Sequence, residues 1–308
     1  MTAPLLVIAA GGTGGHMFPA QALAETMLAR GWRVSLASDD RGLRYAGGFP
    51  EAVERVETPS ASPSRGGLMA KIRAPFAIWR GIAAARARFA ADRPAVVAGF
   101  GGYPALPALA AAWTMGLPRL IHEQNGVLGR VNRLFATRVD RVCCGTWPVK
   151  GAPRGAPLAY LGNPVRAAAV AARATPYAPP GEGPVSLVVF GGSQGASVFA
   201  RAVPQAVALL PESLRARLSV TQQVRDGEEG SVASAYRSAG VEARLERFFA
   251  DMPDLIAGAQ LVIARAGAST VAELTAIGRP ARSPAARPRS GRACRRRTAP
   301  AAPRPRPS

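Results

Sequence analysis

The chain has 308 residues, of which 48% are hydrophobic, and it carries a formal net charge of +20. This length exceeds one ordinary core, so two α/β domains of roughly 150 residues each are expected. No apolar run reaches the roughly 18–20 residues that a membrane span needs. The first residues lead into a strand without the basic segment of a signal peptide. Three cysteines, two of them adjacent, exclude a disulfide framework or a zinc cluster. These features predict a cytoplasmic protein.

Much of the positive charge lies at the carboxyl end. Residues 281–308 hold nine arginines and no acidic residue, which leaves a net charge of +11 on the first 280 residues. This smaller excess fits a basic surface, or an affinity for anionic lipid or a phosphate-rich substrate. The chain has no aromatic-studded basic groove and no helix-turn-helix pattern, so nucleic acid is not an expected partner.

The first half of the chain begins with a βαβ unit. Residues 5–10 are continuously apolar, as expected of a parallel strand buried on both faces. The sequence Gly-Gly-Thr-Gly-Gly-His follows at 11–16. A helix then ends at Gly31, and residues 32–37 are predicted to form the next strand. Further strands are predicted at 95–99, 119–122 and 141–144.

The same pattern restarts after a Pro/Gly-rich stretch at 176–184. An apolar run at 186–190 leads into Gly-Gly-Ser-Gln-Gly-Ala at 191–196. A weaker strand at 261–264 precedes a turn and a helix that includes Glu273. Two strand–glycine-loop–helix units, about 180 residues apart, predict an α/β fold of two Rossmann-like, doubly wound domains that face a cleft.

The composition changes abruptly at Arg282. Residues 282–308 contain six prolines and no Val, Ile, Leu or Phe, so this segment cannot pack a core and is expected to be disordered. A native basic tail is one interpretation. A shifted reading frame is favoured, because the change falls where a turn should lead into another strand. The expected regions are therefore 1–162 and 163–281, the second being a truncated domain, and a non-native tail at 282–308.

Both glycine loops predict anion binding. A glycine loop between a buried strand and a helix presents backbone N–H groups and the positive end of the helix dipole. The first loop lacks the Gly-x-Gly-x-x-Gly spacing of a dinucleotide site, and a generic glycine turn is the alternative for each loop taken alone. The chain has only two histidines, His16 and His122, and each lies beside the carboxyl end of a predicted strand. His16 is the candidate for catalysis, whereas His122, with Glu123, fits a structural role as well as a direct one.

Three polar residues complete the candidate site. The amide of Asn125 can donate to and accept from sugar hydroxyls, and Arg166 can form charge-assisted bonds with a diphosphate. Glu273 could take both hydroxyls of a ribose. The chain has no Asp-x-Asp, so no metal or other cofactor is expected, and helix dipoles with Arg166 would neutralise the diphosphate. An apolar and basic stretch at 68–80, which includes Phe76 and Trp79, predicts either a core-facing helix or a surface that dips into an anionic membrane interface.

Six motifs, in this order, resemble the MurG family of peptidoglycan glycosyltransferases, which have the GT-B fold. The resemblance covers roughly residues 4–281, and the six together are far more specific than any one alone. They are the segments 11–16, 99–104, 122–126, 162–166, 191–196 and 265–273.

The resemblance implies a function and a set of sites. The function is transfer of GlcNAc from UDP-GlcNAc to the MurNAc C4 hydroxyl of lipid I, giving lipid II with inversion at C1. His16 matches the general base. The stretch around Trp79 corresponds to a membrane-contacting patch, which implies a peripheral protein on the anionic, cytoplasmic face of the inner membrane. The positions that match substrate-binding residues are Thr13, Gly14, Gly15, Asn125, Arg166, Ser193, Phe249 and Glu273.

The chain departs from the family pattern after Ala281. The family continues with a strand, a glutamine-bearing loop that grips the donor sugar, and closing helices, none of which is expected here. A poorly folded second half and weak or no activity are therefore expected. The alternatives are a related GT-B transferase with another lipid acceptor such as diacylglycerol, and a nucleotide-binding remnant without turnover. A nicotinamide-dependent dehydrogenase would need Asp39 or Asp40 as its ribose-binding acid, and the loop spacing disfavours it.

Overall fold

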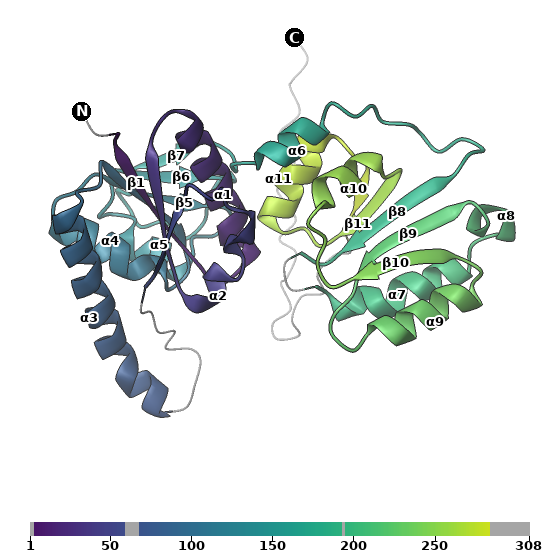
Figure 1. The fold of residues 1–308 in the computed structure, drawn as a ribbon, viewed down its shortest axis with the longest axis horizontal. Helices are drawn as coiled ribbons and strands as arrows, with labels where there is room; N and C mark the ends of the chain where they lie inside the picture. Colours follow the sequence, from purple (N-terminus) through teal and green to yellow (C-terminus); the bar gives the residue numbers. More distant parts are fainter. Residues whose placement is uncertain (1–2, 59–67, 193–194, 284–308) are drawn as a thin grey trace, which may run out of the picture.

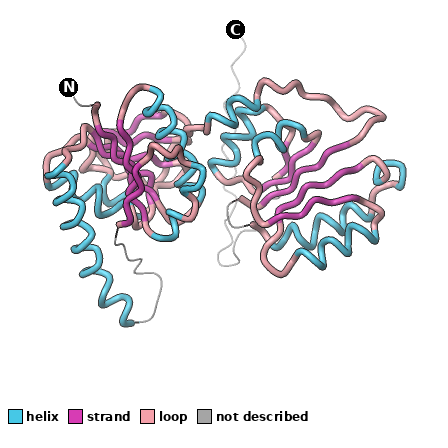
Figure 2. Tube along the Cα trace, viewed as in Figure 1, coloured by secondary structure: helices cyan, strands magenta, loops and turns pink. Residues whose placement is uncertain are grey.

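The computed structural model describes residues 3–58, 68–192 and 195–283, with the backbone alone over 68–74. The chain forms two lobes, each built on one sheet (Figure 1), and each strand pairing within them is parallel. Helices cover both faces of both sheets, as in doubly wound α/β domains (Figure 2). The predicted fold class is confirmed.

The first lobe contains a seven-stranded sheet in the order β3-β2-β1-β4-β5-β6-β7. Its strands are β1 (Leu5–Ala10), β2 (Arg33–Ser38), β3 (Glu54–Glu57), β4 (Val96–Gly101), β5 (Arg119–Glu123), β6 (Arg141–Cys144) and β7 (Leu158–Tyr160). Its α-helices are α1 (Gly14–Ala29), α2 (Asp40–Leu43), α3 (Leu68–Ala91), α4 (Ala105–Thr114) and α5 (Arg130–Phe135), and a 3₁₀ turn spans Ala46–Gly48.

The second lobe contains a five-stranded sheet in the order β10-β9-β8-β11-β12. Its strands are β8 (Val185–Phe190), β9 (Leu218–Gln223), β10 (Glu242–Glu246), β11 (Leu261–Ala264) and β12 (Ala281–Arg282). Its helices are α6 (Ala167–Ala172), α7 (Ser197–Ala208), α8 (Glu212–Arg215), α9 (Glu229–Ser238), α10 (Met252–Gly258) and α11 (Ala268–Ile277).

The packing of the inner strands β1 and β8 explains why their sequences are apolar runs. In β1, Leu5 and Val7 pack into the core beneath α4, whereas Leu6 and Ile8 pack into the opposite core beneath α1. The strand β8 is divided between two cores in the same way. Because successive side chains point to opposite faces and both faces are covered, the buried positions of both strands are all apolar.

The strands that were predicted from apolar runs are confirmed within one or two residues at each end. The strands β3, β7, β9 and β10 were not predicted. One expectation needs correction, because the break placed at Arg282 falls inside β12. Ala281 and Arg282 pair with Val262 and Ile263 of β11, so the first residues of the strand that was thought to be missing are present. Residues 284–308 lie outside the described part of the chain.

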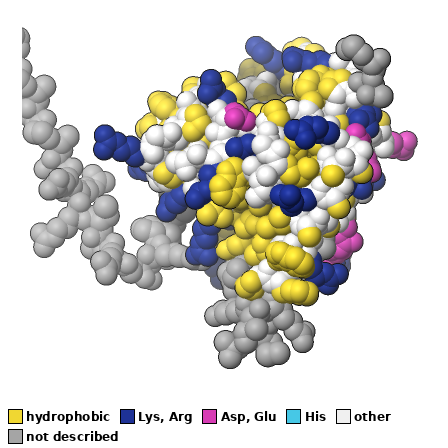
Figure 3. All heavy atoms as spheres, turned by 90° about the vertical axis from the view of Figure 1, so that its left-hand side faces the viewer, with side chains coloured by type: hydrophobic (Ala, Val, Ile, Leu, Met, Phe, Trp, Pro, Cys, Tyr) yellow, Lys and Arg dark blue, Asp and Glu magenta, His cyan; other side chains and the backbone are white. Residues whose placement is uncertain are grey.

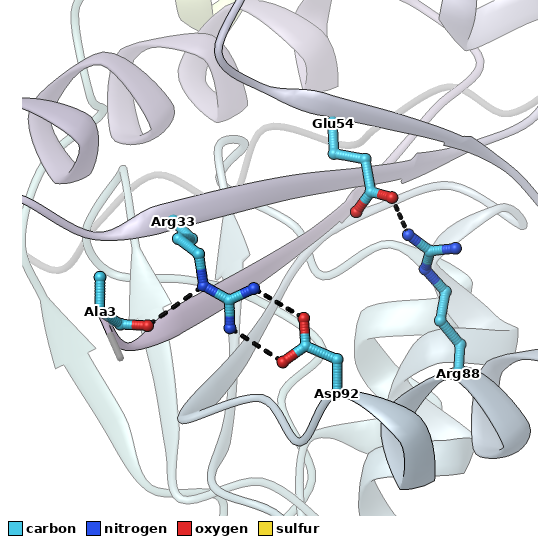
Figure 4. Close-up of polar contacts among 5 residues, drawn as sticks. All are labelled: Ala3, Arg33, Glu54, Arg88 and Asp92. Atoms are coloured by element: carbon cyan, nitrogen blue, oxygen red, sulfur yellow. Dashed lines mark hydrogen bonds and ion pairs between the residues drawn. The ribbon is translucent and has the colours of Figure 1, made fainter. Parts of the chain in front are cut away.

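Helix α3 is fastened to the edge of the first sheet at its carboxyl end (Figure 4). Arg88 of α3 pairs with Glu54 of β3, and Arg33 of β2 forms two 2.8 Å bonds to the carboxylate of Asp92. The bonds from Arg33 lower the pKa of Asp92. These contacts hold the carboxyl end of α3, and the helix projects from the lobe (Figure 1). Among the described residues, no helix is long and apolar enough to cross a membrane.

Candidate active site between the two lobes

The topology places two glycine loops at the positions where open α/β sheets bind ligands. Strand order reverses between β1 and β4 in the first sheet, and between β8 and β11 in the second. Ligands bind outside the carboxyl ends of the strands at such a point. Residues 11–13 after β1 lie there, as do the described residues of the loop after β8, at 191–192 and 195–196. The two glycine loops that the sequence predicts as a pair therefore occupy equivalent positions in the two sheets.

The two lobes touch through helix α1 of the first lobe and the first turns of α6 and α11 of the second. Helix α1 lies beside α11 where the lobes meet (Figure 1). The hydroxyl of Ser269 in α11 donates to the carbonyl of Gly15 at 3.2 Å, and the backbone N–H of Ala167 donates to Glu25 of α1 at 2.8 Å. The amino end of α1 is thus presented to the second lobe.

The first glycine loop ends in an extended residue that begins α1. Gly12 has φ +86°, a conformation that favours glycine. Thr13 is the N-cap of α1 with φ −155°, and its side chain makes no capping bond within the described part of the chain. The carbonyl of Thr13 accepts from the N–H of His16, which holds the histidine in the first turn. The loop therefore places Thr13, Gly14, Gly15 and His16 together at the helix end.

In the second loop, Gly191 packs so closely that an added Cβ would lie 2.4 Å from the nitrogen of Ala196. Ser193, a predicted donor-binding residue, lies outside the described residues. The acid that a dehydrogenase would need is engaged elsewhere, because Asp39 accepts from the N–H of Gly42 at the start of α2.

His16 is held by a residue that sequence reasoning did not single out. Its Nδ1 lies 3.1 Å from Oε1 of Gln124, at the end of β5. Gly101, with φ +95°, leaves room for the ring, because an added Cβ there would lie 3.1 Å from Cε1 of His16. The other ring nitrogen, Nε2, forms no hydrogen bond within the described residues. Among the described residues, His16 is therefore held at one ring nitrogen and has no hydrogen-bond partner at the other.

Glu123 organises the loop that holds Asn125. Its buried carboxylate accepts at Oε1 from the backbone N–H and the side-chain amide of Asn125, each at 3.1 Å. At Oε2 it accepts from the N–H of Gly129 and from the amide of Asn132. Glu123 thus has a structural role, whereas Asn125 itself is exposed.

Arg166 and Glu273 are brought together across 107 residues of sequence. The guanidinium of Arg166 donates to both carboxylate oxygens of Glu273, at 2.6 and 2.9 Å. The two side chains are only 14% and 10% exposed. The ring of Phe18, from α1 in the first lobe, lies 4.4 Å from the guanidinium carbon. This contact was not predicted, since nothing in the sequence marks Phe18 as more than a core residue.

The ion pair and Phe18 line one pocket between the lobes. Phe249, one of the residues that match substrate-binding positions, is buried there beneath the guanidinium of Arg244. The pocket joins residues from both lobes, and its lining consists of Phe18, Arg166, Phe190, Gly192, Gln223, Phe248, Phe249, Met252, Thr270 and Glu273.

Two facing Rossmann-like lobes, with a glycine loop at each switch point and an imidazole and a guanidinium at their junction, define a GT-B glycosyltransferase. The comparisons agree, because two family models match most of the chain. Residues 6–144 match the glycosyltransferase family 28 N-terminal domain, and residues 186–281 match its C-terminal domain. The chain belongs to glycosyltransferase family 28.

The names of the relatives of this chain state one specific activity. A protein from Chelativorans sp. strain BNC1 is 48% identical over 91% of this chain and 75% of its own length. A protein from Brucella abortus strain S19 is 49% identical over 90% of this chain and 73% of its own. Both are UDP-N-acetylglucosamine--N-acetylmuramyl-(pentapeptide) pyrophosphoryl-undecaprenol N-acetylglucosamine transferases.

Solved structures show the same similarity. MurG of Acinetobacter baumannii superposes with a TM-score of 0.64 at 26% identity, over 88% of this chain and 74% of that one. The chain is thus an N-acetylglucosaminyltransferase of the peptidoglycan-synthesising branch.

Proposed function

We propose that this chain transfers GlcNAc from UDP-GlcNAc to the C4 hydroxyl of MurNAc in lipid I, undecaprenyl-diphospho-MurNAc-pentapeptide, and so makes lipid II. The names of relatives at 48–49% identity support this reaction. The observation that carries it is the position of His16 in the first turn of α1 at the junction of the lobes, with its ring bonded at Nδ1 and without a hydrogen bond at Nε2 from any residue that the structure describes.

The two domains would divide the substrates between them. Residues 1–162 would form the acceptor domain and residues 163–281 the donor domain, joined after β7. Thr13, Gly14 and Gly15 would direct the amino end of α1 toward phosphate oxygens, where the helix dipole favours negative charge. Asn125, on the loop that Glu123 holds, would contact a sugar hydroxyl.

The donor would bind chiefly at the pocket of the second lobe. Ser193 would contact the diphosphate, and the backbone of Phe249 would meet the uracil. Glu273 would accept from the two ribose hydroxyls, and Arg166 would donate to the diphosphate. Because Arg166 and Glu273 bond to each other in the structure, donor binding would exchange that ion pair for two sets of contacts with the nucleotide.

The chemistry would be a single displacement. Nε2 of His16 takes the proton from the C4 hydroxyl as the oxygen attacks C1 of GlcNAc. The bond between C1 and the diphosphate oxygen breaks, and UDP leaves with the electron pair. Attack opposite the leaving group inverts C1. Proton transfer by a positioned base of this kind contributes about 10²–10⁴-fold to the rate.

The acceptor is a lipid, and one surface of the first lobe suits a membrane. Phe76 and Trp79 of α3 are 62% and 64% exposed, their rings 6.2 Å apart, and Trp113 of α4 is also exposed. Arg80 and Arg138 lie against these rings. Figure 3 shows hydrophobic side chains gathered on this face with Lys and Arg around them. Such a face supports peripheral attachment to the anionic, cytoplasmic side of the inner membrane.

The reaction is tested with purified chain, UDP-GlcNAc and defined acceptors. Transfer to lipid I that falls at least about 10²-fold in His16→Ala, with donor affinity kept, is the expected result. Transfer to diacylglycerol instead of lipid I would indicate a different lipid acceptor. Donor binding without any transfer would indicate a nucleotide-binding remnant. Failure to bind UDP-GlcNAc would refute the proposal.

Membrane attachment is tested by sedimentation with vesicles that contain anionic lipid. The double variant Phe76→Ser with Trp79→Ser should bind less. Leu209→Ser is the matched control, because Leu209 is 87% exposed but lies on the second lobe at the end of α7. Equal loss in both variants, or no loss in the double variant, would argue against α3 as the membrane face.

A further inference from the structure

A row of buried hydrogen bonds runs from β5 to His16. Gln124 is 1% exposed and His122 is 4% exposed. The side-chain nitrogen of Gln124 donates to the carbonyls of Phe100 and His122, at 3.1 and 3.2 Å. The same nitrogen lies 3.3 Å from Nδ1 of His122. The side-chain oxygen of Gln124 lies 3.1 Å from Nδ1 of His16.

The carbonyl groups fix which end of Gln124 faces which neighbour. A backbone carbonyl can only accept, so the amide NH₂ must face Phe100 O and His122 O. The oxygen Oε1 therefore faces His16, and an amide oxygen can only accept. It follows that Nδ1 of His16 has the hydrogen. In a neutral imidazole the second nitrogen then has the lone pair, and that nitrogen is Nε2.

His122 adopts the opposite tautomer. Its Nε2 lies 3.0 Å from the carbonyl of Gly162, so Nε2 has the hydrogen and Nδ1 accepts from Gln124. Burial lowers the pKa of His122, which keeps the ring neutral and able to accept. The ring of Phe100 stacks on it at 5.4 Å between centroids. The row thus runs from Nδ1 of His16 through the side-chain amide of Gln124 and the ring of His122 to the carbonyl of Gly162, and the amide NH₂ of Gln124 is shared among three acceptors.

We infer that Gln124 is a positioning residue that locks His16 in the Nδ1–H tautomer, with the Nε2 lone pair free to take the acceptor proton, and that His122 and Gly162 orient Gln124. This inference rests on the proposed function of His16. An amide sets the tautomer and the ring orientation without placing a negative charge beside the base, unlike the carboxylate that holds the histidine in a Ser-His-Asp triad. An imidazole that is free to turn would favour Nε2–H in water and would direct its hydrogen at the substrate.

The tautomers can be observed directly, because the chain has only two histidines. Long-range ¹H–¹⁵N correlation spectra of chain labelled with ¹⁵N-histidine should show opposite tautomers for the two rings, Nδ1–H for His16 and Nε2–H for His122. Gln124→Met, which keeps the length of the side chain and removes its hydrogen bonds, should abolish the Nδ1–H form of His16. An Nε2–H form of His16 in the unsubstituted chain would overturn the inference, whatever the activity.

Kinetics separate this inference from the proposed function. Gln124→Met should lower kcat with lipid I by about 10²-fold, as for a base displaced by about 1 Å, while the KM for UDP-GlcNAc stays close to its starting value. If His16→Ala retains full turnover, the proposed base is wrong. If His16→Ala is inactive and Gln124→Met is fully active, only the positioning role is wrong.

A pair of substitutions at His122 tests the far end of the row. His122→Asn keeps an acceptor oxygen near the position of Nδ1 and should retain most of kcat and the Nδ1–H form of His16. His122→Leu removes the acceptor and should lower kcat toward that of Gln124→Met. Equal kcat values for the two His122 variants would contradict a role for His122 through Gln124.

Discussion

Gly101 gives the sharpest test of how tightly His16 must be held. It lies at the end of β4 with φ +95°, and a Cβ added to it would lie 3.1 Å from Cε1 and 3.3 Å from Nδ1 of His16. Gly101→Ala therefore introduces backbone strain of about 1–3 kcal/mol and also displaces the ring by a few tenths of an ångström or more. Because a misplacement of about 1 Å can cost about 10²-fold in rate, kcat should fall between tenfold and about 10²-fold.

The matched control is Gly31→Ala, at the turn that follows α1. Gly31 has φ +79°, and an added Cβ there would meet no atom within 4 Å. Both variants should lose similar stability in urea denaturation, but only Gly101→Ala should lose turnover with lipid I, and neither should change UDP binding by more than about twofold. Full turnover in Gly101→Ala, or an equal loss in Gly31→Ala, would refute the claim that contact with His16 is the cause.

Three further outcomes are expected. Glu273→Ala should weaken UDP binding at least tenfold in calorimetry and destabilise the chain by about 3 kcal/mol, because it leaves the buried guanidinium of Arg166 unpaired. Burial lowers the pKa of His122, so below about pH 6.5 the unfolded chain binds more protons than the folded one. The stabilising contribution of neutral His122 is present above that pH and is lost as pH falls toward the folded pKa. His122→Asn should therefore flatten the dependence of the urea midpoint on pH. Tyr236→Phe should cost about 1–3 kcal/mol, since Gln222 would lose the 2.6 Å bond from the tyrosine hydroxyl in a buried position.

The sequence predicts the centre of each sheet better than its edges. Strands β1 and β8 are buried on both faces and are therefore visible as apolar runs. Strands β3 and β10 contain Glu-Arg-Val-Glu and Glu-Ala-Arg-Leu-Glu and lie at the outer edges of their sheets. Edge strands face solvent, and charged side chains on them discourage pairing with another chain. The charged sequences of β3 and β10 resemble those of loops, and only the pairing with a neighbouring strand in the structure identifies them as strands.

The place of the candidate residues in the fold could be predicted from the sequence, but their contacts could not. The rule that ligands bind at carboxyl ends of strands places His16, Asn125 and the second glycine loop correctly at the rims of the two sheets. The bond between His16 and Gln124 joins residues 108 positions apart, and sequence spacing contains no information about it. A signal was nevertheless present, because Gln124 stands between His122 and Asn125 at the end of a buried strand, where an uncharged polar residue needs a partner.

The contact between Arg166 and Glu273 changes the interpretation of both residues. Each was predicted to bind the nucleotide, yet in the structure each neutralises the other in a nearly buried position. A diphosphate offers Arg166 the negative charge that Glu273 supplies, and two ribose hydroxyls offer Glu273 the donors that Arg166 supplies. At the start and at the end of the proposed exchange, neither charge would be buried without a partner, so the large penalty for an unpaired buried ion would be avoided. If the donor binds as proposed, the pair would keep both charges partnered before binding without preventing it, and affinity would depend on the difference between two satisfied arrangements.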